Sequence, residues 1–167
     1  SALLPNKRGP TYVRLLNILK LLFGDEFPEG LHFVTDFEEG ILWALDELSI
    51  THHTCFFHLF QTIIEWMKEM GLITKFWRDR GFRHRIYSMT SIAFLQPEWI
   101  RTAFYQLGPY FKPDEFPVRD KFMRLYIGEK DLRTGAYKTP RFPPELWSNY
   151  YRLLRGEDTT QTSNEQY

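Results

Sequence analysis

The sequence lacks several features that would assign it to a class at once. It has a single cysteine, Cys55, in 167 residues, which excludes an intramolecular disulfide framework and favours a reducing compartment. It has no apolar run of about 18 residues or more, so no membrane span is predicted, and its start shows no signal-peptide pattern. Lys and Arg are also absent between Lys20 and Lys68.

The charges that are present are unevenly distributed. Residues 1–67 carry four Lys or Arg and nine Asp or Glu, and residues 68–167 carry seventeen and twelve, although the net charge is zero. A zero net charge argues against a dedicated nucleic-acid binder. A metal-dependent nucleic-acid enzyme could still use this division, with carboxylates holding cations and basic groups holding phosphates. An ordinary uneven surface explains the division more simply, so charge alone favours no nucleic-acid function.

Apolar periodicity predicts an α/β chain with a helical second half. Aromatic residues make up 17% of the sequence, and we expect Trp66, Trp77, Trp99 and Trp147 to lie in the core. The alternating first half predicts a short mixed or parallel sheet with crossover helices. One predicted strand ends at residue 5, and two more span residues 31–35 and 51–56. The predicted helices span residues 10–23, 37–48, 58–70, 73–94, 98–111, 119–127 and 145–154. Inward positions are predicted at Tyr12, Leu15, Leu16, Leu19, Phe23, Ile41, Ala44, Leu45 and Leu48.

Asp36 follows an apolar strand and precedes a helix. An acid at the carboxyl end of a strand lies at the rim of an open sheet, where such sheets place their functional sites. The structural alternative is that Asp36 caps the helix starting at Phe37, with Glu38 and Glu39 favoured by the helix dipole.

Cys55 and His58 form a Cys-x-x-His pair. A structural zinc site needs four ligands and no second cysteine exists, so a buried cysteine and a histidine in the first turn of a helix explain the pair better. Cysteine–histidine catalysis would need an oxyanion hole and an orienting group, and the sequence shows neither.

A basic segment with interleaved aromatic residues spans residues 75–85. It contains Lys75, Arg78, Arg80, Arg83 and Arg85 and one acid. This pattern suits contact with a nucleic-acid backbone, and it suits the solvated face of an amphipathic helix equally well.

The order of short motifs along the chain resembles Mutator-like element (MULE) DNA transposases. Phe33 to Glu38 resembles the strand that carries the second catalytic aspartate of that family, and Cys55 to Gln61 resembles its Cys-x-x-His motif. Further similar segments are residues 2–7 with Thr11 and Tyr12, residues 70–72, residues 94–97, residues 142–144 with Trp147 and Asn149, and the polar end of the chain.

The resemblance implies a partial RNase H-like fold in residues 1–72, a helical insertion in 73–155 and, in 156–167, a polar tail approaching the third acid. It implies DNA transposition in the nucleus through an Asp-Asp-Glu triad and two Mg²⁺ or Mn²⁺ ions about 3.5–4 Å apart. Asp36 and Glu165 would be catalytic metal ligands, and Cys55 and His58 belong to a motif without an assigned role. Expected partners are transposon-end and target DNA, with a homo-oligomer in a transposition complex.

The first triad aspartate matches no strand in this sequence. We therefore expect an incomplete catalytic segment that does not cleave DNA alone. Two other interpretations stay open: a host-adopted or decayed transposase domain that binds DNA or protein without catalysis, and a helical interaction domain unrelated to transposons.

Overall fold

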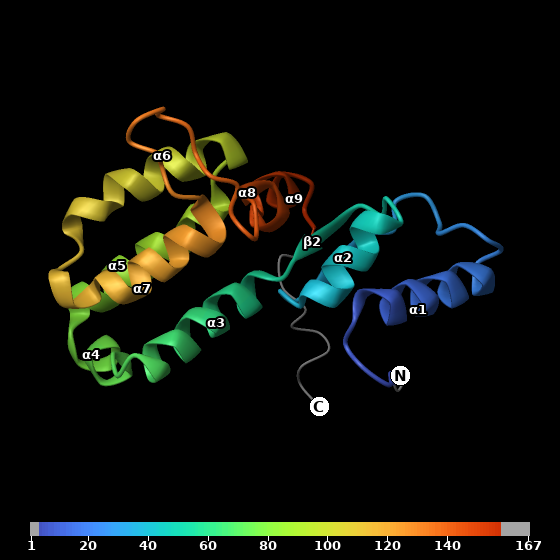
Figure 1. The fold of residues 1–167 in the computed structure, drawn as a ribbon, viewed down its shortest axis with the longest axis horizontal. Coiled ribbons are helices and arrows are strands. Elements are labelled where there is room, and N and C mark those ends of the chain that lie inside the picture. Colours follow the sequence, from blue (N-terminus) through green and yellow to red (C-terminus); the bar gives the residue numbers. More distant parts are fainter. Residues whose placement is uncertain (1–3, 158–167) are drawn as a thin grey trace. The chain divides into compact units, whose positions relative to one another are not determined.

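The computed structural model describes residues 4–157 and is mostly helical (Figure 1). Among these residues, helices account for 62% and strands for 5%, with one parallel sheet of two strands. The predicted α/β class is therefore confirmed as a mixed, helix-rich fold. Internal contacts divide the chain into a first unit, residues 1–55, and a second unit, residues 56–167. The domain boundaries predicted at residues 72 and 155 depend on motifs and remain predictions.

The first unit contains a strand–helix–strand motif preceded by a helix. Its elements are α1 (Gly9–Leu22), β1 (Phe33–Thr35), α2 (Glu39–Glu47) and β2 (His52–Thr54). The strands are parallel, with Phe33 opposite His52 and Thr35 opposite Thr54. A parallel pair needs a crossover connection, and α2 provides it. The predicted order of helix, strand, helix and strand is confirmed from α1 on. The predicted first strand is not found, because Leu4 and Pro5, its described part, lie in no strand.

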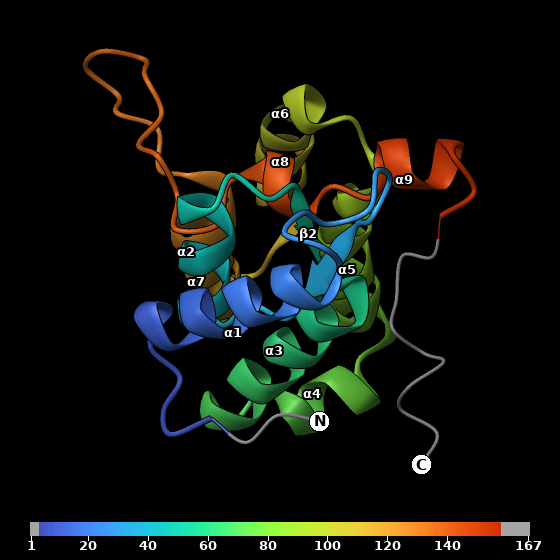
Figure 2. The same cartoon turned by 90° about the vertical axis from the view of Figure 1, so that its right-hand side faces the viewer.

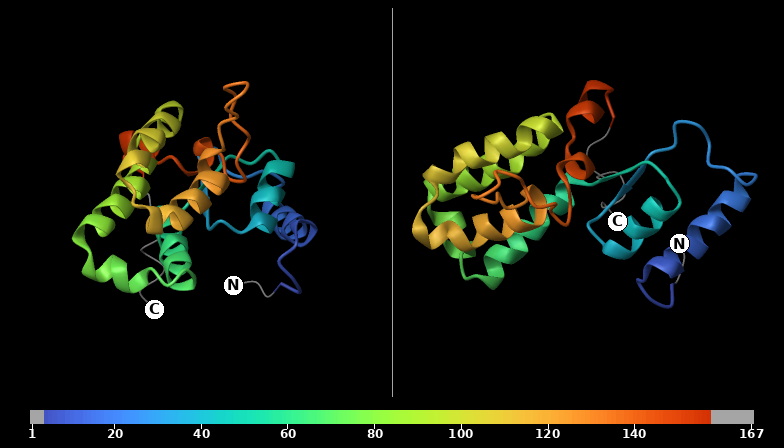
Figure 3. Two further views of the ribbon diagram at one scale, coloured as in Figure 1. Left: turned by 60° about the vertical axis from the view of Figure 1, so that its left-hand side comes forward. Right: turned by 45° about the horizontal axis from the view of Figure 1, so that its top comes forward.

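The core of the first unit lies between α1 and α2, which pack side by side (Figure 3). Leu16, Ala44 and Leu45 are buried, as their helical spacing predicts. Tyr12, Leu19, Phe33, Ile41 and Leu48 pack around them. The prediction for Phe23 is wrong, because this residue is 57% exposed. It lies beyond the end of α1, where helical periodicity no longer directs its side chain inward.

In residues 56–157, the described part of the second unit, all regular elements are helical. Its α-helices are α3 (Phe56–Glu69), α4 (Ile73–Arg78), α5 (Arg80–Ser91), α6 (Pro97–Leu107), α7 (Phe116–Phe122), α8 (Pro144–Trp147) and α9 (Tyr150–Leu154). Short 3₁₀ turns are η1 (Ile92–Phe94), η2 (Gly108–Tyr110) and η3 (Pro113–Glu115), and η4 (Met123–Ile127) is a π-helical turn.

Two predicted helices are interrupted, one by a local and one by long-range hydrogen bonds. The helix expected over 73–94 is interrupted at Asp79, whose extended backbone ends α4 and whose carboxylate accepts a hydrogen bond from the Phe82 N–H at 3.0 Å to start α5. The helix expected over 145–154 is interrupted at Ser148. Its hydroxyl donates to the Leu95 carbonyl at 2.8 Å, and the Asn149 N–H donates to the Ala93 carbonyl at 2.7 Å. These long-range bonds replace helical ones.

The core of the second unit is rich in stacked aromatic rings. Tyr126 lies at its centre and contacts Trp66, Phe122 and Trp147 at ring-centroid distances of 6.0, 5.0 and 5.9 Å. The core positions predicted for Trp66 and Trp147 are therefore confirmed. Those of two other tryptophans are wrong, because Trp77 is 62% and Trp99 59% exposed. The adjacent residues in the sequence, Phe76 and Ile100, occupy the buried positions of α4 and α6, so the indole side chains lie on the exposed side of each helix.

A loop between η4 and α8 extends away from the helices of the second unit (Figure 2). Its base is held by Tyr105, whose hydroxyl donates to the Gly128 carbonyl at 3.1 Å and accepts the Lys130 N–H at 3.1 Å. An antiparallel bridge joins Lys130 to Tyr137. Leu132 near the tip is 96% exposed. No helix in the described part of the chain combines the length and apolarity needed to cross a bilayer.

Candidate functional site

Asp36 lies exposed at the carboxyl end of β1. Its Oδ1 accepts the Glu38 N–H at 3.1 Å, which shapes the turn between β1 and α2. The alternative expectation, that Asp36 caps this helix, is wrong in position, since Glu38 is the N-cap residue and α2 begins at Glu39. The Asp36 carboxylate is therefore available to solvent at the end of a parallel strand.

Glu38 joins this turn to the start of the chain. Its Oε2 accepts a hydrogen bond from Lys7 Nζ at 2.6 Å, and its Oε1 accepts one from the Tyr12 hydroxyl. The Glu38 side chain is 18% exposed, whereas that of Lys7 is 78% exposed. The network places an ammonium group beside the carboxylates of the turn.

The network changes the acidity of its members. Burial raises the pKa of Glu38, but hydrogen bonds from Lys7 and Tyr12 outweigh it and hold that pKa below its ordinary value. The hydrogen bond to Glu38 raises the pKa of Lys7, and the negative charge of Asp36 adds to the effect. Burial and the hydrogen bond to Glu38 raise the pKa of Tyr12 to about 12. Glu38 is thus an anion and Lys7 a cation near neutral pH.

Asp36 is the one predicted metal ligand that lies within the described residues. The oxygen of Asp36 suits Mg²⁺ or Mn²⁺ chemically. Within residues 4–157, however, no three His, Cys, Asp or Glu side chains gather closely enough to hold a metal ion. Glu165, the other predicted ligand, lies outside the described residues. One carboxylate does not make a two-metal centre, so no reaction step through a metal can be derived from this part of the chain.

Cys55 and His58 lie in different units. Cys55 directly follows β2, is fully buried, and donates its N–H to the Thr35 carbonyl at 2.8 Å. His58 lies in the first turn of α3. These placements agree with the structural interpretation of the motif, a buried cysteine at a strand end and a histidine at a helix start.

Two of the five predicted DNA-binding residues are tied to a buried acid. Glu115 is fully buried, and its Oε1 lies 2.7 Å from Lys75 Nζ and 2.6 Å from Arg85 Nη2. Its Oε2 accepts Arg85 Nε at 2.8 Å and the Lys112 N–H at 3.0 Å. Lys75 also pairs with Asp114 at 2.7 Å. Lys75 and Arg85 therefore hold α4, α5 and η3 together, because they neutralise a buried charge.

The other three predicted DNA-binding residues are Arg78, Arg80 and Arg83. Arg78 and Arg80 are exposed and form no ion pair with any residue in 4–157. Arg83 donates from Nη1 to the Trp77 carbonyl at 2.9 Å. Their contact with DNA remains a prediction, but their charges are not cancelled by neighbouring acids.

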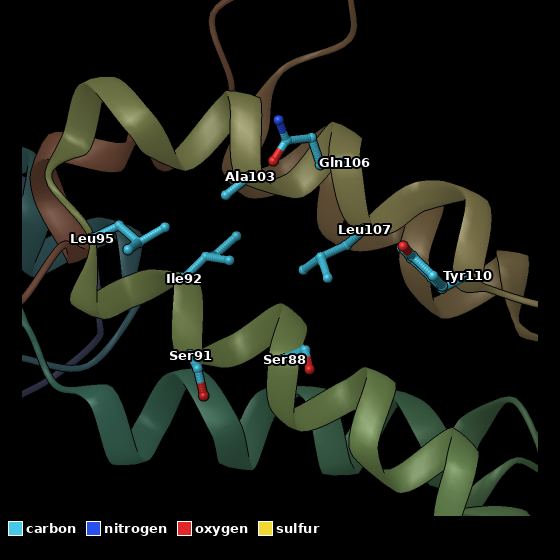
Figure 4. Close-up of a pocket in the computed structure, with 8 residues that line it drawn as sticks. All are labelled: Ser88, Ser91, Ile92, Leu95, Ala103, Gln106, Leu107 and Tyr110. Carbon is cyan, nitrogen blue, oxygen red and sulfur yellow. The ribbon is translucent and has the colours of Figure 1, made fainter.

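A groove of about 660 Å³ runs between α5 and η1 on one side and α6 and η2 on the other (Figure 4). Ile92 and Leu107 point toward each other across it. Its lining residues are Ser88, Ser91, Ile92, Leu95, Ala103, Gln106, Leu107 and Tyr110, and none of them carries a charge. The groove therefore lacks the acids or bases that the predicted chemistry needs.

Sequence reasoning missed two acids that join distant segments of the chain, Glu38 and Glu115. Each was one acid among several in its segment, and nothing local marks the one whose partners come from distant residues. No protein-family model, curated protein or solved structure matches the chain. The interpretation of the site therefore depends on the residues themselves.

Proposed function

We propose that this chain is a segment of an RNase H-like transposase catalytic domain that performs metal-dependent phosphodiester cleavage and strand transfer in the full-length protein. The observation that carries the proposal is the exposed carboxylate of Asp36 at the end of a parallel strand in a strand–helix–strand motif. Open α/β sheets place their ligand sites outside the carboxyl ends of their strands.

Asp36 contributes a hard oxygen ligand in this proposal. Two cations held by carboxylates stabilise the attacking and leaving oxygens of a phosphodiester displacement. Glu165 is the proposed second ligand from this chain, and a further acid comes from outside it. The partners are transposon-end and target DNA in the nucleus, bound by a homo-oligomer.

Paramagnetic broadening by Mn²⁺ tests the role of Asp36 without requiring activity. In an amide NMR spectrum of the protein, we expect low Mn²⁺ concentrations to broaden the signals of residues 34–38 first. Asp36→Asn should abolish this broadening. Asp46→Asn is the matched control, because Asp46 is also an exposed acid of the first unit, with a 76% exposed side chain, but lies at the opposite end of α2.

The proposal fails if broadening near residue 36 is the same in Asp36→Asn as in the unsubstituted protein, or if it centres on Asp46. Lys7→Met sharpens the test. Removing the ammonium beside Glu38 should increase Mn²⁺ affinity at this turn, since a competing cation is lost.

A second candidate is a transposase-derived module that binds DNA or protein without catalysis. Two observations favour it: residues 4–157 contain no group of three possible metal ligands, and Arg78 and Arg80 in the second unit form no ion pair within these residues. DNA binding that is insensitive to Mn²⁺ and to Asp36→Asn would support this candidate over the enzyme.

A further inference from the structure

The corner between α4 and α5 is held in a fixed shape. Asp79 is both the C-cap residue of α4 and the N-cap residue of α5, and its carboxylate accepts a hydrogen bond from the Phe82 N–H at 3.0 Å. That hydrogen bond lowers the pKa of Asp79, so the cap is ionised near neutral pH. The chain therefore changes direction at Asp79, between the end of α4 and the start of α5.

Two exposed aromatic rings share one buried ring at this corner. Phe76 is fully buried, and its ring meets Trp77 edge-on at 5.0 Å and 77° and Tyr87 edge-on at 5.8 Å and 73°. Trp77 is nevertheless 62% exposed and Tyr87 45% exposed. Each exposed ring therefore packs against the buried Phe76 side chain.

Three arginine residues, Arg78, Arg80 and Arg83, belong to the corner around Trp77. The Arg83 guanidinium, on α5, donates from Nη1 to the Trp77 backbone carbonyl at 2.9 Å, which places its charge at the Trp77 backbone. Arg78 and Arg80 flank the corner and form no ion pair within the described residues. The nearby charges of Lys75 and Arg85, in contrast, are neutralised by Asp114 and Glu115. Three of the five basic residues are thus left for an anionic partner.

We propose that this corner is a stacking site for single-stranded nucleic acid, in which a base stacks on Trp77 and Arg78, Arg80 and Arg83 contact the adjacent phosphates. The inference deepens the proposed function, on which it rests, by naming the nucleic-acid form that the second unit binds. Single-strand binders combine aromatic platforms with cationic tracks. A duplex hides its base faces in the stack, so an outward indole favours an unpaired strand.

Fluorescence anisotropy with a labelled oligothymidylate tests the site in the whole chain. We expect Trp77→Ala to weaken binding roughly tenfold or more, because one stacked base is lost. Trp77→Phe should lose less, because it keeps a ring. Trp99→Ala is the matched control and should bind within about twofold of the unsubstituted protein, since Trp99 is 59% exposed but lies on α6.

The salt dependence separates the arginines from the ring. Replacing Arg78, Arg80 and Arg83 by Ala should reduce the slope of log affinity against log salt by about 2, because each phosphate contact on a single strand contributes about 0.7. Trp77→Ala should leave that slope unchanged. Circular dichroism on each variant confirms that the fold is retained.

Three results would overturn the stacking site: no binding of oligothymidylate at low salt, equal losses in Trp77→Ala and Trp99→Ala, or tighter binding of a duplex of equal length. Asp36→Asn distinguishes this inference from the catalytic proposal. Single-strand binding that depends on Trp77 but shows no Mn²⁺ site at Asp36 keeps the stacking site and rejects the enzyme.

Discussion

Replacing Glu115 with Gln tests whether a buried charge holds α4, α5 and η3 together. The Glu115 carboxylate is fully buried and receives charged donors from Lys75 and Arg85 and the backbone N–H of Lys112. Burial alone would raise its pKa, but hydrogen bonds from Arg85 and Lys75 outweigh burial and keep that pKa below the ordinary value. Glu115→Gln removes the negative charge and turns an amide N–H₂ group toward two cations.

The expected loss of unfolding free energy is about 3 kcal/mol. Breaking a buried ion pair costs about 3–5 kcal/mol. The lower end applies because the Lys75 and Arg85 side chains are 22% and 17% exposed and keep partial hydration. Lys75 also keeps its pair with Asp114. With a urea dependence of about 2 kcal/mol per molar, this loss lowers the midpoint by about 1.5 M.

Urea unfolding followed by tryptophan fluorescence measures this loss, because four of the five tryptophans lie in the second unit. Asp114→Asn is the matched control. It contacts the same Lys75, but its side chain is 63% exposed, so the expected loss is below about 1 kcal/mol. Equal losses for the two variants would refute the argument that burial makes Glu115 important.

Other changes test the first unit, the loop and the activity. Glu38→Gln should destabilise the protein by about 1–2 kcal/mol at neutral pH. Because the folded-state pKa of Glu38 is lowered from 4.5, the stability that its carboxylate contributes is present above pH 4.5 and is lost as the pH falls through the lower value. The urea midpoints of the variant and the unsubstituted protein should therefore converge in acid and not in base. In thermal unfolding, Gly128→Ala should lower the free energy of unfolding by more than about 2 kcal/mol, since φ is +90° and a Cβ would lie 2.0 Å from the Lys138 carbonyl oxygen. Gly135→Ala is the control, because φ is +71° but the space around it is open, and it should cost only about 1 kcal/mol. Equal effects of the two substitutions would contradict the steric argument. In a plasmid-nicking assay with Mn²⁺ the chain alone should show no cleavage, whereas robust nicking lost in Asp36→Ala would reject the incomplete-segment proposal.

The helices and strands of the first unit could be predicted because their signals are local. A short apolar run that includes Phe33 and Val34 marks β1, and a 3.6-residue spacing marks the inward face of α2 at Ala44 and Leu45. Gly71, with φ +70°, ends the turn after α3 as its position predicts. The helix breaks at Asp79 and Ser148 could not be predicted as easily. Ser148 stops its helix by bonding to Leu95, and a partner so distant in sequence leaves no local pattern.

The residue types of the candidate site could be predicted, but the residues that each side chain contacts could not. The strand-end position of Asp36 follows from the strand pattern, and the structure places it there. The basic segment is one charged stretch in the sequence. The fold divides it into two residues that neutralise Glu115 and three that form no ion pair within residues 4–157, of which Arg78 and Arg80 are exposed. Trp77 is exposed because its neighbour Phe76 occupies the buried position of α4. Composition cannot predict which of two adjacent aromatic residues will be the buried one.

The loop after η4 has a consequence for chain cleavage. Its tip near Leu132 is open to a protease, whereas its two ends are fastened separately: Arg101 Nε donates to the Ile127 carbonyl at 3.0 Å, and the Phe142 N–H donates to the Leu125 carbonyl at 2.8 Å. Downstream, Trp147 is buried against Phe122 and Tyr126. Trypsin acting at Arg133 would therefore leave two polypeptides that remain associated through the aromatic core, so the second unit suits a split-protein reporter divided at this tip.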